Sequence, residues 1–413
     1  RMRKMKHSIE DINYAQSLFD RFYNIGAIDT GGVTRLGYTQ VEDEMHRAFI
    51  DAGAIDGYTY THDEVGNTYV GYGNMQHGSI LIGSHLDSVI DGGRYDGVAG
   101  IIAGLMVLHW AKRTLPDINI SVGAFRCEES SNFGRCTIGS GLITKEIYKN
   151  DMGSLVGKDG RSLHDIFEER GYDLNPSKIP DVDKYLELHI EQGKILEEYN
   201  TEVGIVTTIA GPRRFMLHII GNPEHSGATP MDMRHDALCA ASEIILEIEG
   251  IGKEEAMYQS VATVGTVEVK PNALNVIPGE VNMGIDMRGI DNSSLERMEN
   301  RLKNSSQSIC KKRGMTLFIE KLSSIPPIEL SKEVGQDLAA AAKRLNISYR
   351  MMPSGAGHDA MSFAPYCAAS MVFIPCVKGI SHNKREFTSI ESILDGASVM
   401  YEYLKECEKH DFD

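Results

Sequence analysis

A glycine-rich stretch at residues 83–100, GSHLDSVIDGGRYDGVAG, places one histidine and several aspartates between two apolar segments. The segment before it, SILI, is typical of a buried strand, and the segment after it, IIAGLMVLHWA, is typical of a buried helix. His85 and Asp96 are of residue types that bind divalent cations, and Asp87 could accept the second N–H of the His85 imidazole and fix its tautomer. A single histidine at a strand end is more often structural, so a metal site requires ligands from other segments.

Three further segments carry side chains of the same kind at or just after apolar, strand-like runs. They contain the pair Glu128–Glu129, His189 in LELHIEQG and His382 in GISHN. Histidines and carboxylates from several strand ends are the ligands that a site for two borderline divalent ions requires. A carboxylate that bridges both ions would lower the repulsion between them. The spacing alone leaves two interpretations open, a metal site and a set of unrelated polar residues.

The elements around these residues form an α/β pattern. Near-continuous apolar strands alternate with helices in the first half of the chain, and the same style resumes near the C-terminus. This pattern predicts a mixed, mostly parallel sheet between layers of helices. Ligands of such sheets gather where loops leave the carboxyl ends of the strands, and His85 and Glu128 both lie just past strand ends of this kind.

The middle of the chain follows a different order. Between residues 211 and 324 the predicted elements run β-α-β-β-α-β, which is the ferredoxin-like pattern. Short segments that contain Gly or Pro flank it, IAGP on one side and SSIPPIE on the other, as is typical of linkers. The sequence therefore predicts a catalytic domain built from residues 1–210 and 325–413 and an inserted α+β domain at 211–324.

The composition is that of an ordinary soluble globular protein, with 413 residues of which 42% are hydrophobic and 24% are charged. A formal net charge of -16 argues against a nucleic-acid-binding protein, which normally has a basic face. No apolar run approaches the ~20 residues that span a bilayer, and no apolar core of a signal peptide follows the basic N-terminus. Seven cysteines without a C-x-x-C pair favour a reducing, cytoplasmic compartment.

A series of motifs along the chain resembles the M20 metallopeptidase-like amidohydrolases, in particular the branch of allantoate amidohydrolases, N-carbamoyl-L-amino-acid hydrolases and β-ureidopropionases. The motifs are GSHLDSV, GGRYDGVAG, EES, ELHIEQG, EHSGATPM, NALNVIPG, DMRGID, SGAGHDAM and GISHN, and they extend over nearly the whole chain. The resemblance implies two divalent metal ions per subunit, zinc or manganese with cobalt or nickel as alternatives. It also implies that the inserted domain acts as a lid and forms a homodimer.

The resemblance further implies roles for the candidate ligands. Asp96 would bridge the two ions, and Glu128 would be the general base that activates water. The remaining ligands would be His85 and His189 for one ion, and Glu129 and His382 for the other. The peptide bond after Asp96 would be cis.

The resemblance places the substrate contacts in other motifs. Arg288 in DMRGID would hold the substrate carboxylate, because a guanidinium binds a carboxylate with a two-pronged geometry that Lys lacks; the alternative is a surface arginine on an alternating strand. Asn275 and His225 match positions at the ureido group or its oxyanion. Gln192 and the backbone at Gly357 would line the pocket. In the homodimer, His225 would complete the active site of the other subunit.

Together these implications predict a cytoplasmic, metal-dependent amidohydrolase that cleaves the ureido C–N bond of allantoate or of N-carbamoyl-L-amino acids and releases ammonia and carbon dioxide. PNALNVIPG favours allantoate, whereas GSHLDSVIDGGRYDGV with GHDAM favours N-carbamoyl amino acids, so the substrate stays open between these ureido acids. One alternative is an M20 carboxypeptidase or aminoacylase that acts on N-acyl amino acids or peptides. Another is a non-catalytic binding protein on the same fold, although Glu128 and all the ligands are present.

Two residues beside the glutamate pair depart from the pattern of many relatives. Ser130 replaces a glycine and Asn132 replaces an arginine. Because these positions flank the pair without altering it, we expect the departures to affect substrate preference rather than activity.

Overall fold

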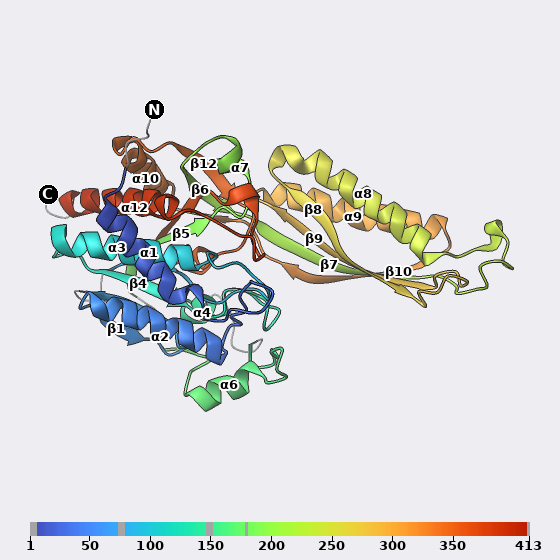
Figure 1. The fold of residues 1–413 in the computed structure, drawn as a ribbon. Helices are drawn as coiled ribbons and strands as arrows, with labels where there is room; N and C mark the ends of the chain where they lie inside the picture. The colour runs from blue at the N-terminus through green and yellow to red at the C-terminus, as the bar shows by residue number, and fades with distance from the viewer. Residues whose placement is uncertain (1–5, 73–78, 146–151, 178–180, 411–413) are drawn as a thin grey trace. The chain divides into compact units, whose positions relative to one another are not determined.

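Figure 1 shows a computed structural model of the chain, which describes residues 6–72, 79–145, 152–177 and 181–410. The chain folds into two compact units. The large unit consists of Arg1–Thr207 and Glu329–Asp413, and the inserted unit consists of Thr208–Ile328. Among the described residues, we find no helix with the length and apolar character that crossing a membrane would require.

The large unit is built around a mixed nine-stranded sheet with strand order β1-β2-β4-β3-β5-β13-β6-β11, in which β12 pairs with β6. Its central strands run parallel to one another, and they are β4 (Ile120–Phe125), β3 (Ser79–His85), β5 (Val182–Ile190) and β13 (Ala368–Ile374). The flanking strands are β1 (Thr59–His62), β2 (Thr68–Tyr72), β6 (Val203–Ile209), β11 (Ile328–Glu329) and β12 (Tyr349–Ser354). Antiparallel pairing of β2 with β4 and of β6 with β13 makes the sheet mixed, as predicted.

Helices on one face of this sheet enclose the main apolar core. They are α1 (Ile9–Tyr23), α2 (Gln40–Ile55), α3 (Val98–Thr114), α10 (Lys332–Arg344) and α12 (Ile390–His410). Every residue of α3 from Val98 to Leu108 is buried, because this helix is apolar on all sides and is covered by the sheet and by other helices. The core face of the sheet includes Ile82 and Leu188, which alternate with residues that point to the opposite face.

The opposite face carries an aromatic layer. The rings of Tyr185 and Phe363 stack with their centroids 4.3 Å apart, and Phe125 packs 5.1 Å from Phe363. The shorter helices of the large unit are α4 (Ile138–Ile143), α6 (Leu163–Arg170), α7 (Ile195–Glu198), α11 (Ala360–Phe363) and the 3-10 helix at Val377–Gly379. Both faces of the sheet are therefore covered, which explains why its central strands are apolar almost without interruption.

The inserted unit is a four-stranded antiparallel sheet in the order β10-β7-β9-β8, which is the ferredoxin-like order that the sequence predicts. Its elements are β7 (Gly211–Ile220), α8 (Ala237–Glu255), β8 (Val261–Lys270), β9 (Glu280–Gly289), α9 (Asn292–Lys312) and β10 (Thr316–Ser324), with 3-10 helices at Met231–Met233 and Ala256–Tyr258. Asp236 and Asp291 cap the two helices with their carboxylates. Alternate residues of β7 and β9 pack under these helices, and the other face of the sheet is open.

Candidate metal centre

The predicted metal ligands lie at the edge of the large sheet where its parallel strands end. His85 is the last residue of β3 and His189 is the last but one of β5, both on the face opposite the main core. The pair Glu128–Glu129 follows β4, His382 follows β13, and Asp96 stands just before α3. Because parallel strands present their carboxyl ends at one edge, the sheet brings together segments that are far apart in the sequence.

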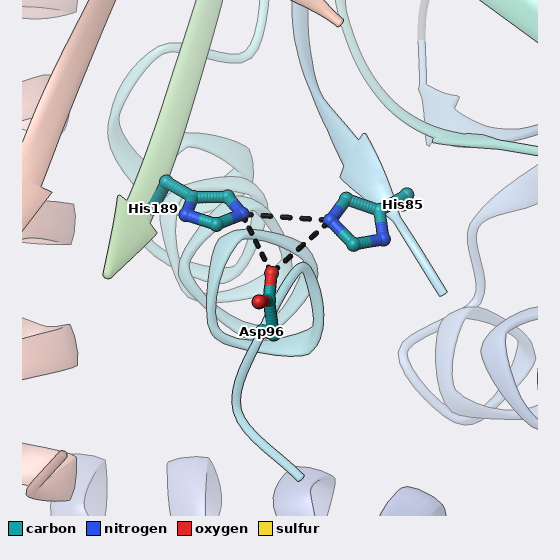
Figure 2. A group of neighbouring side chains, drawn as sticks. All are labelled: His85, Asp96 and His189. Carbon is teal, nitrogen blue, oxygen red and sulfur yellow. Dashed lines mark hydrogen bonds and ion pairs between the residues drawn. The ribbon is translucent and has the colours of Figure 1, made fainter. Parts of the chain in front are cut away.

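His85, Asp96 and His189 form the first of two groups that could hold a metal ion (Figure 2). All three are buried, and Asp96 Oδ1 lies 3.3 Å from His85 Nε2 and 3.0 Å from His189 Nε2. The two Nε2 atoms are 3.4 Å apart. The Nδ1 atoms face backbone carbonyl oxygens, that of Asp87 at 3.2 Å and that of Ile190 at 2.9 Å. A carbonyl oxygen only accepts, so each Nδ1 carries a proton, and in the neutral ring each Nε2 has a lone pair that could bind a metal ion.

This arrangement fits a cation. Asp96 Oδ1 is buried and has no hydrogen-bond partner in the described part of the chain. Burial alone would lower the pKa of His85, but the charge of Glu128 and the close contacts with Asp87 and Asp96 raise that pKa well above its usual value, so the surroundings favour positive charge at this point. A divalent ion bound to both Nε2 atoms and to Oδ1 would satisfy all three donor atoms at once.

Asp96, Glu129 and His382 form the second group. His382 Nε2 lies 3.3 Å from Asp96 Oδ2 and 3.2 Å from Glu129 Oε1. Hydrogen bonds to these two carboxylates raise the pKa of His382 to about 10. The two oxygens of Asp96 thus face two different groups, which is the geometry that a bridging carboxylate needs.

Negative charge is concentrated around both groups. Buried carboxyl groups that belong to these groups or interact with their residues include those of Asp87, Asp96, Glu128, Glu129, Glu187, Asp359 and Glu386. Four of these carboxyl groups, those of Asp87, Asp96, Glu128 and Glu129, lie within ion-pair distance of His85, His189 or His382. Buried charges of one sign are costly unless they are paired or bind metal ions, so the donor set also fits a second cation.

The glutamate pair is anchored by Asp87, which is fully buried. Its Oδ1 accepts the backbone N–H of Glu128 at 3.0 Å and its Oδ2 accepts that of Glu129 at 3.0 Å. Its Oδ1 also lies 3.3 Å from His85 Nδ1, the contact that the sequence predicts. The residue before the pair, Cys127, has a left-handed φ of 53°, so the chain turns sharply there before the two glutamates.

The Glu128 side chain belongs to neither metal group, although its Oε2 lies 3.8 Å from His85 Nε2. Burial raises the pKa of Glu128 well above its usual value, and the charges of Glu129 and Asp359 add to the rise although His85 opposes it. A carboxylate whose pKa is raised holds a proton more strongly than an ordinary carboxylate, as a general base requires.

Gly97 explains the close approach of Asp96 to His85. Its φ is 66°, and a Cβ at this position would lie 2.5 Å from the carbonyl oxygen of His85 and 2.7 Å from its ring. The expected cis bond is wrong, however. Within the described residues only Lys270–Pro271 is cis, so the bond between Asp96 and Gly97 is trans.

Sequence reasoning missed Glu386 and Ser381, whose signal was their place beside His382 in GISHNKREF. Ser381 Oγ lies 3.0 Å from Asp96 Oδ2 and 3.0 Å from Glu386 Oε2. Gln192, predicted as a substrate contact, donates from Nε2 to Asp96 Oδ2 at 2.9 Å, while its buried Oε1 has no partner in the described residues. Gln192 is therefore placed at the metal groups.

The remaining predicted substrate contacts are divided between the two units. Gly357 stands in the loop after β12, next to His358, whose ring packs edge-on against the His189 ring at 4.5 Å. The other three, His225, Asn275 and Arg288, belong to the inserted unit.

Within the inserted unit, His225 and Asn275 occupy neighbouring loops. Ser226 donates its backbone N–H to the Asn275 carbonyl at 3.0 Å. The exposed His225 imidazole accepts two backbone N–H groups at Nδ1, at 3.1 and 3.2 Å. In the neutral ring the proton is then on Nε2, which is left as a hydrogen-bond donor.

Arg288 lies at the other end of the inserted sheet. It pairs in register with Pro212 near the start of β7, whereas the His225 loop follows Ile220 at the end of β7. At ~3.4 Å per residue, these two ends of the strand are about 27 Å apart. One small molecule cannot touch both Arg288 and His225 of the same inserted unit.

The departures beside the glutamate pair have a structural explanation at one position. The buried Asn132 donates from Nδ2 to the Gly37 carbonyl at 2.8 Å, and its Oδ1 accepts the backbone N–H of Lys158 at 2.9 Å. The amide thus ties two loops together. Nothing in the structure explains Ser130.

Comparison with known proteins identifies relatives along nearly the whole chain. The sequence model of peptidase family M20/M25/M40 matches residues 81–406. An N-carbamoyl-L-amino-acid amidohydrolase of a Pseudomonas species is 34% identical, over 92% of this chain and 94% of the relative. The allantoate amidohydrolase of Escherichia coli is 34% identical, over 91% of this chain and 93% of the relative. A solved amidase of the hydantoinase/carbamoylase family from Burkholderia multivorans has a TM-score of 0.86 and 33% identity, and covers 95% of this chain and 97% of its own.

Proposed function

The chain belongs to peptidase family M20/M25/M40 and is a hydrolase, and we propose that it uses two divalent metal ions to cleave the ureido C–N bond of allantoate, of ureidoglycolate or of an N-carbamoyl-L-amino acid. The observation that carries this proposal is the pair of ligand groups that share Asp96. Relatives about a third identical to the chain are named for these three kinds of substrate. The products would be an amine-bearing acid, ammonia and carbon dioxide.

The two groups would each hold one ion. His85 and His189 with Asp96 Oδ1 would bind the first ion, and Glu129 and His382 with Asp96 Oδ2 the second. Zinc and manganese suit these nitrogen and oxygen ligands, as do cobalt and nickel. Such ions, when bound, act as Lewis acids that stabilise negative charge and favour the deprotonation of water.

Glu128 is the general base of the proposed reaction. It adjoins the first group and belongs to neither, so its carboxylate is available for proton transfer. It would take a proton from water and deliver it to the nitrogen that leaves. Asp87 would hold the backbone of both glutamates, so that the Glu129 side chain binds metal while the Glu128 side chain transfers protons.

A homodimer formed through the inserted unit would complete the site. Because Arg288 and the His225 loop lie at opposite ends of the inserted sheet, His225 and Asn275 would serve the active site of the other subunit, and Arg288 that of its own. The Nε2–H of His225 would then donate to the oxyanion that develops on the carbamoyl oxygen, and Arg288 would bind the substrate carboxylate. The free state of the described cysteines supports a reducing, cytoplasmic location.

The test is a panel of substrates assayed with metal-free protein that has been reloaded with zinc or with manganese. Allantoate, ureidoglycolate and N-carbamoyl-L-amino acids should release ammonia, whereas N-acetyl amino acids and dipeptides should not be cleaved. Cleavage of the acetyl or peptide substrates alone would instead support the aminoacylase or carboxypeptidase alternative. Failure to turn over any of them with either metal would support a binding protein on this fold.

A further inference from the structure

We propose that Glu386 is a positioning residue that holds Asp96 and the segment Ser381–His382 in the arrangement that the second metal group requires. This role rests on the dinuclear site proposed above. Glu386 is not itself a member of either ligand group, and it reaches the centre only through backbone N–H groups and a hydroxyl.

The contacts of Glu386 connect two loops that are far apart in the sequence. Its side chain is buried, and Oε1 accepts the backbone N–H groups of Tyr95 at 2.9 Å and of Asp96 at 3.0 Å. Oε2 lies 3.0 Å from Ser381 Oγ, which in turn lies 3.0 Å from Asp96 Oδ2. One carboxyl group therefore fixes the backbone of Asp96 and, through Ser381, the oxygen that faces His382.

Neither loop has regular structure that could do this alone. Asp96 stands in the loop that leads into α3, and His382 stands between the short 3-10 helix after β13 and α12. The backbone of His382 is in the left-handed region with a φ of 54°, which is costly for a residue other than glycine and persists only where its surroundings hold it. Glu386 donates its own backbone N–H to the Asn383 carbonyl at 2.9 Å, which closes a turn directly after His382.

The room for this carboxyl group comes from Gly93. A Cβ at Gly93 would overlap the Glu386 carboxyl group, whereas the backbone φ of Gly93 is outside the positive range and accepts other residues. Gly93→Ala would therefore displace the Glu386 side chain without changing its chemistry. It offers a second, independent way to disturb the same contact.

The experiment is a titration of metal-free protein with Mn²⁺, followed by calorimetry for affinity and by electron paramagnetic resonance for coupling between two ions. We expect Glu386→Met to bind the second ion at least about tenfold more weakly, the scale of a lost partner behind a ligand. The first ion should be weakened less, because Asp96 belongs to both groups but, of its two carboxylate oxygens, Glu386 reaches only Oδ2, through Ser381. Gly93→Ala should weaken metal binding in the same way as Glu386→Met. Glu386→Gln should bind both ions, because its Oε1 can accept both N–H groups and its Nε2–H can donate to Ser381 Oγ.

Asp63 offers a matched control in the same unit. Its Oδ1 also accepts two backbone N–H groups, those of Val65 at 3.0 Å and Asn67 at 2.9 Å, but it touches no predicted ligand. Asp63→Leu should lower the melting temperature of the metal-free protein and still bind two ions.

The outcomes separate the possibilities. Two ions bound to a folded Glu386→Met protein with wild-type affinities, or both ions weakened to the same extent, would overturn the positioning role. If Glu386→Met does not fold, Gly93→Ala and Ser381→Ala carry the test, and either should weaken the second ion more than the first. A wild-type protein that binds only one Mn²⁺ would refute the dinuclear site itself, which is a different failure.

Discussion

Replacing Glu128 with Gln should separate proton transfer from metal binding. Gln has the same shape, and the backbone N–H at this position can still donate to Asp87 Oδ1, a bond of 3.0 Å in the wild type. An amide cannot take a proton from water, so we expect kcat to fall by about 10²–10⁴-fold, which corresponds to about 2.7–5.4 kcal/mol of lost transition-state stabilisation. The number of bound ions should stay at two, because the Glu128 side chain is in neither ligand group.

The same change should stabilise the metal-free protein. Burial raises the pKa of Glu128 well above its usual 4.5, so its ionised form is disfavoured in the folded state. A group whose folded pKa is raised contributes stability that is complete below the unfolded pKa and is lost as the pH rises through the folded pKa. The melting temperature of Glu128→Gln should therefore exceed that of the wild type at pH values well above 4.5, and the difference should shrink as the pH falls towards 4.5.

Three measurements check this reasoning: ammonia release, metal content by mass spectrometry, and calorimetric melting in the presence of a chelator. Glu129→Gln is the matched control, because its Oε1 belongs to the second group and lies 3.2 Å from His382 Nε2. That variant should lose one ion. Near-normal turnover in Glu128→Gln, or equal loss of metal in both variants, would show that the division of roles is wrong.

Three further predictions follow from the proposed site. Chelation should abolish turnover and Zn²⁺ or Mn²⁺ should restore it; full activity in metal-free protein, checked by metal analysis, would contradict the metal centre. Arg288→Lys should lower kcat/KM by about ten- to hundredfold, because a hydrogen bond to a charged group is worth about 1.5–3 kcal/mol and the guanidinium fork is lost. Arg214→Lys also removes a guanidinium paired with Asp286, and it should leave kcat/KM unchanged. A wild type that hydrolyses substrates with an amidated carboxylate equally well would exclude the role of Arg288. Mixing His225→Ala with Glu128→Gln subunits should restore activity, since each mixed dimer has one intact site; no recovery despite demonstrated subunit exchange would place His225 in its own subunit or outside the reaction.

The local order of the sequence determined the architecture of both units. Met283 and Met287 alternate with polar residues along β9, and this period of two predicts a sheet with one buried face, which is where both side chains lie. The residues of β4 are apolar apart from Ser121, which likewise predicts a strand covered on both sides, and all of them are buried. Such patterns can be recognised in the sequence because the side chains of a strand point alternately to its two faces, so burial of one or both faces is recorded in neighbouring residues. They also indicated that His85 ends a strand.

Which side chains meet at the metal centre was decided by the tertiary structure. His85 and His189 are 104 residues apart in the chain, yet their Nε2 atoms are 3.4 Å apart, because β3 and β5 are neighbours in the sheet. Periodicity carries no information on strand order, so only the resemblance to a family suggested this pairing beforehand. The anchoring of the glutamate pair by Asp87 and the contacts of Glu386 had no such signal. They depend on single hydrogen bonds between loops, whose direction follows from how the whole chain packs and not from any repeating pattern in the sequence.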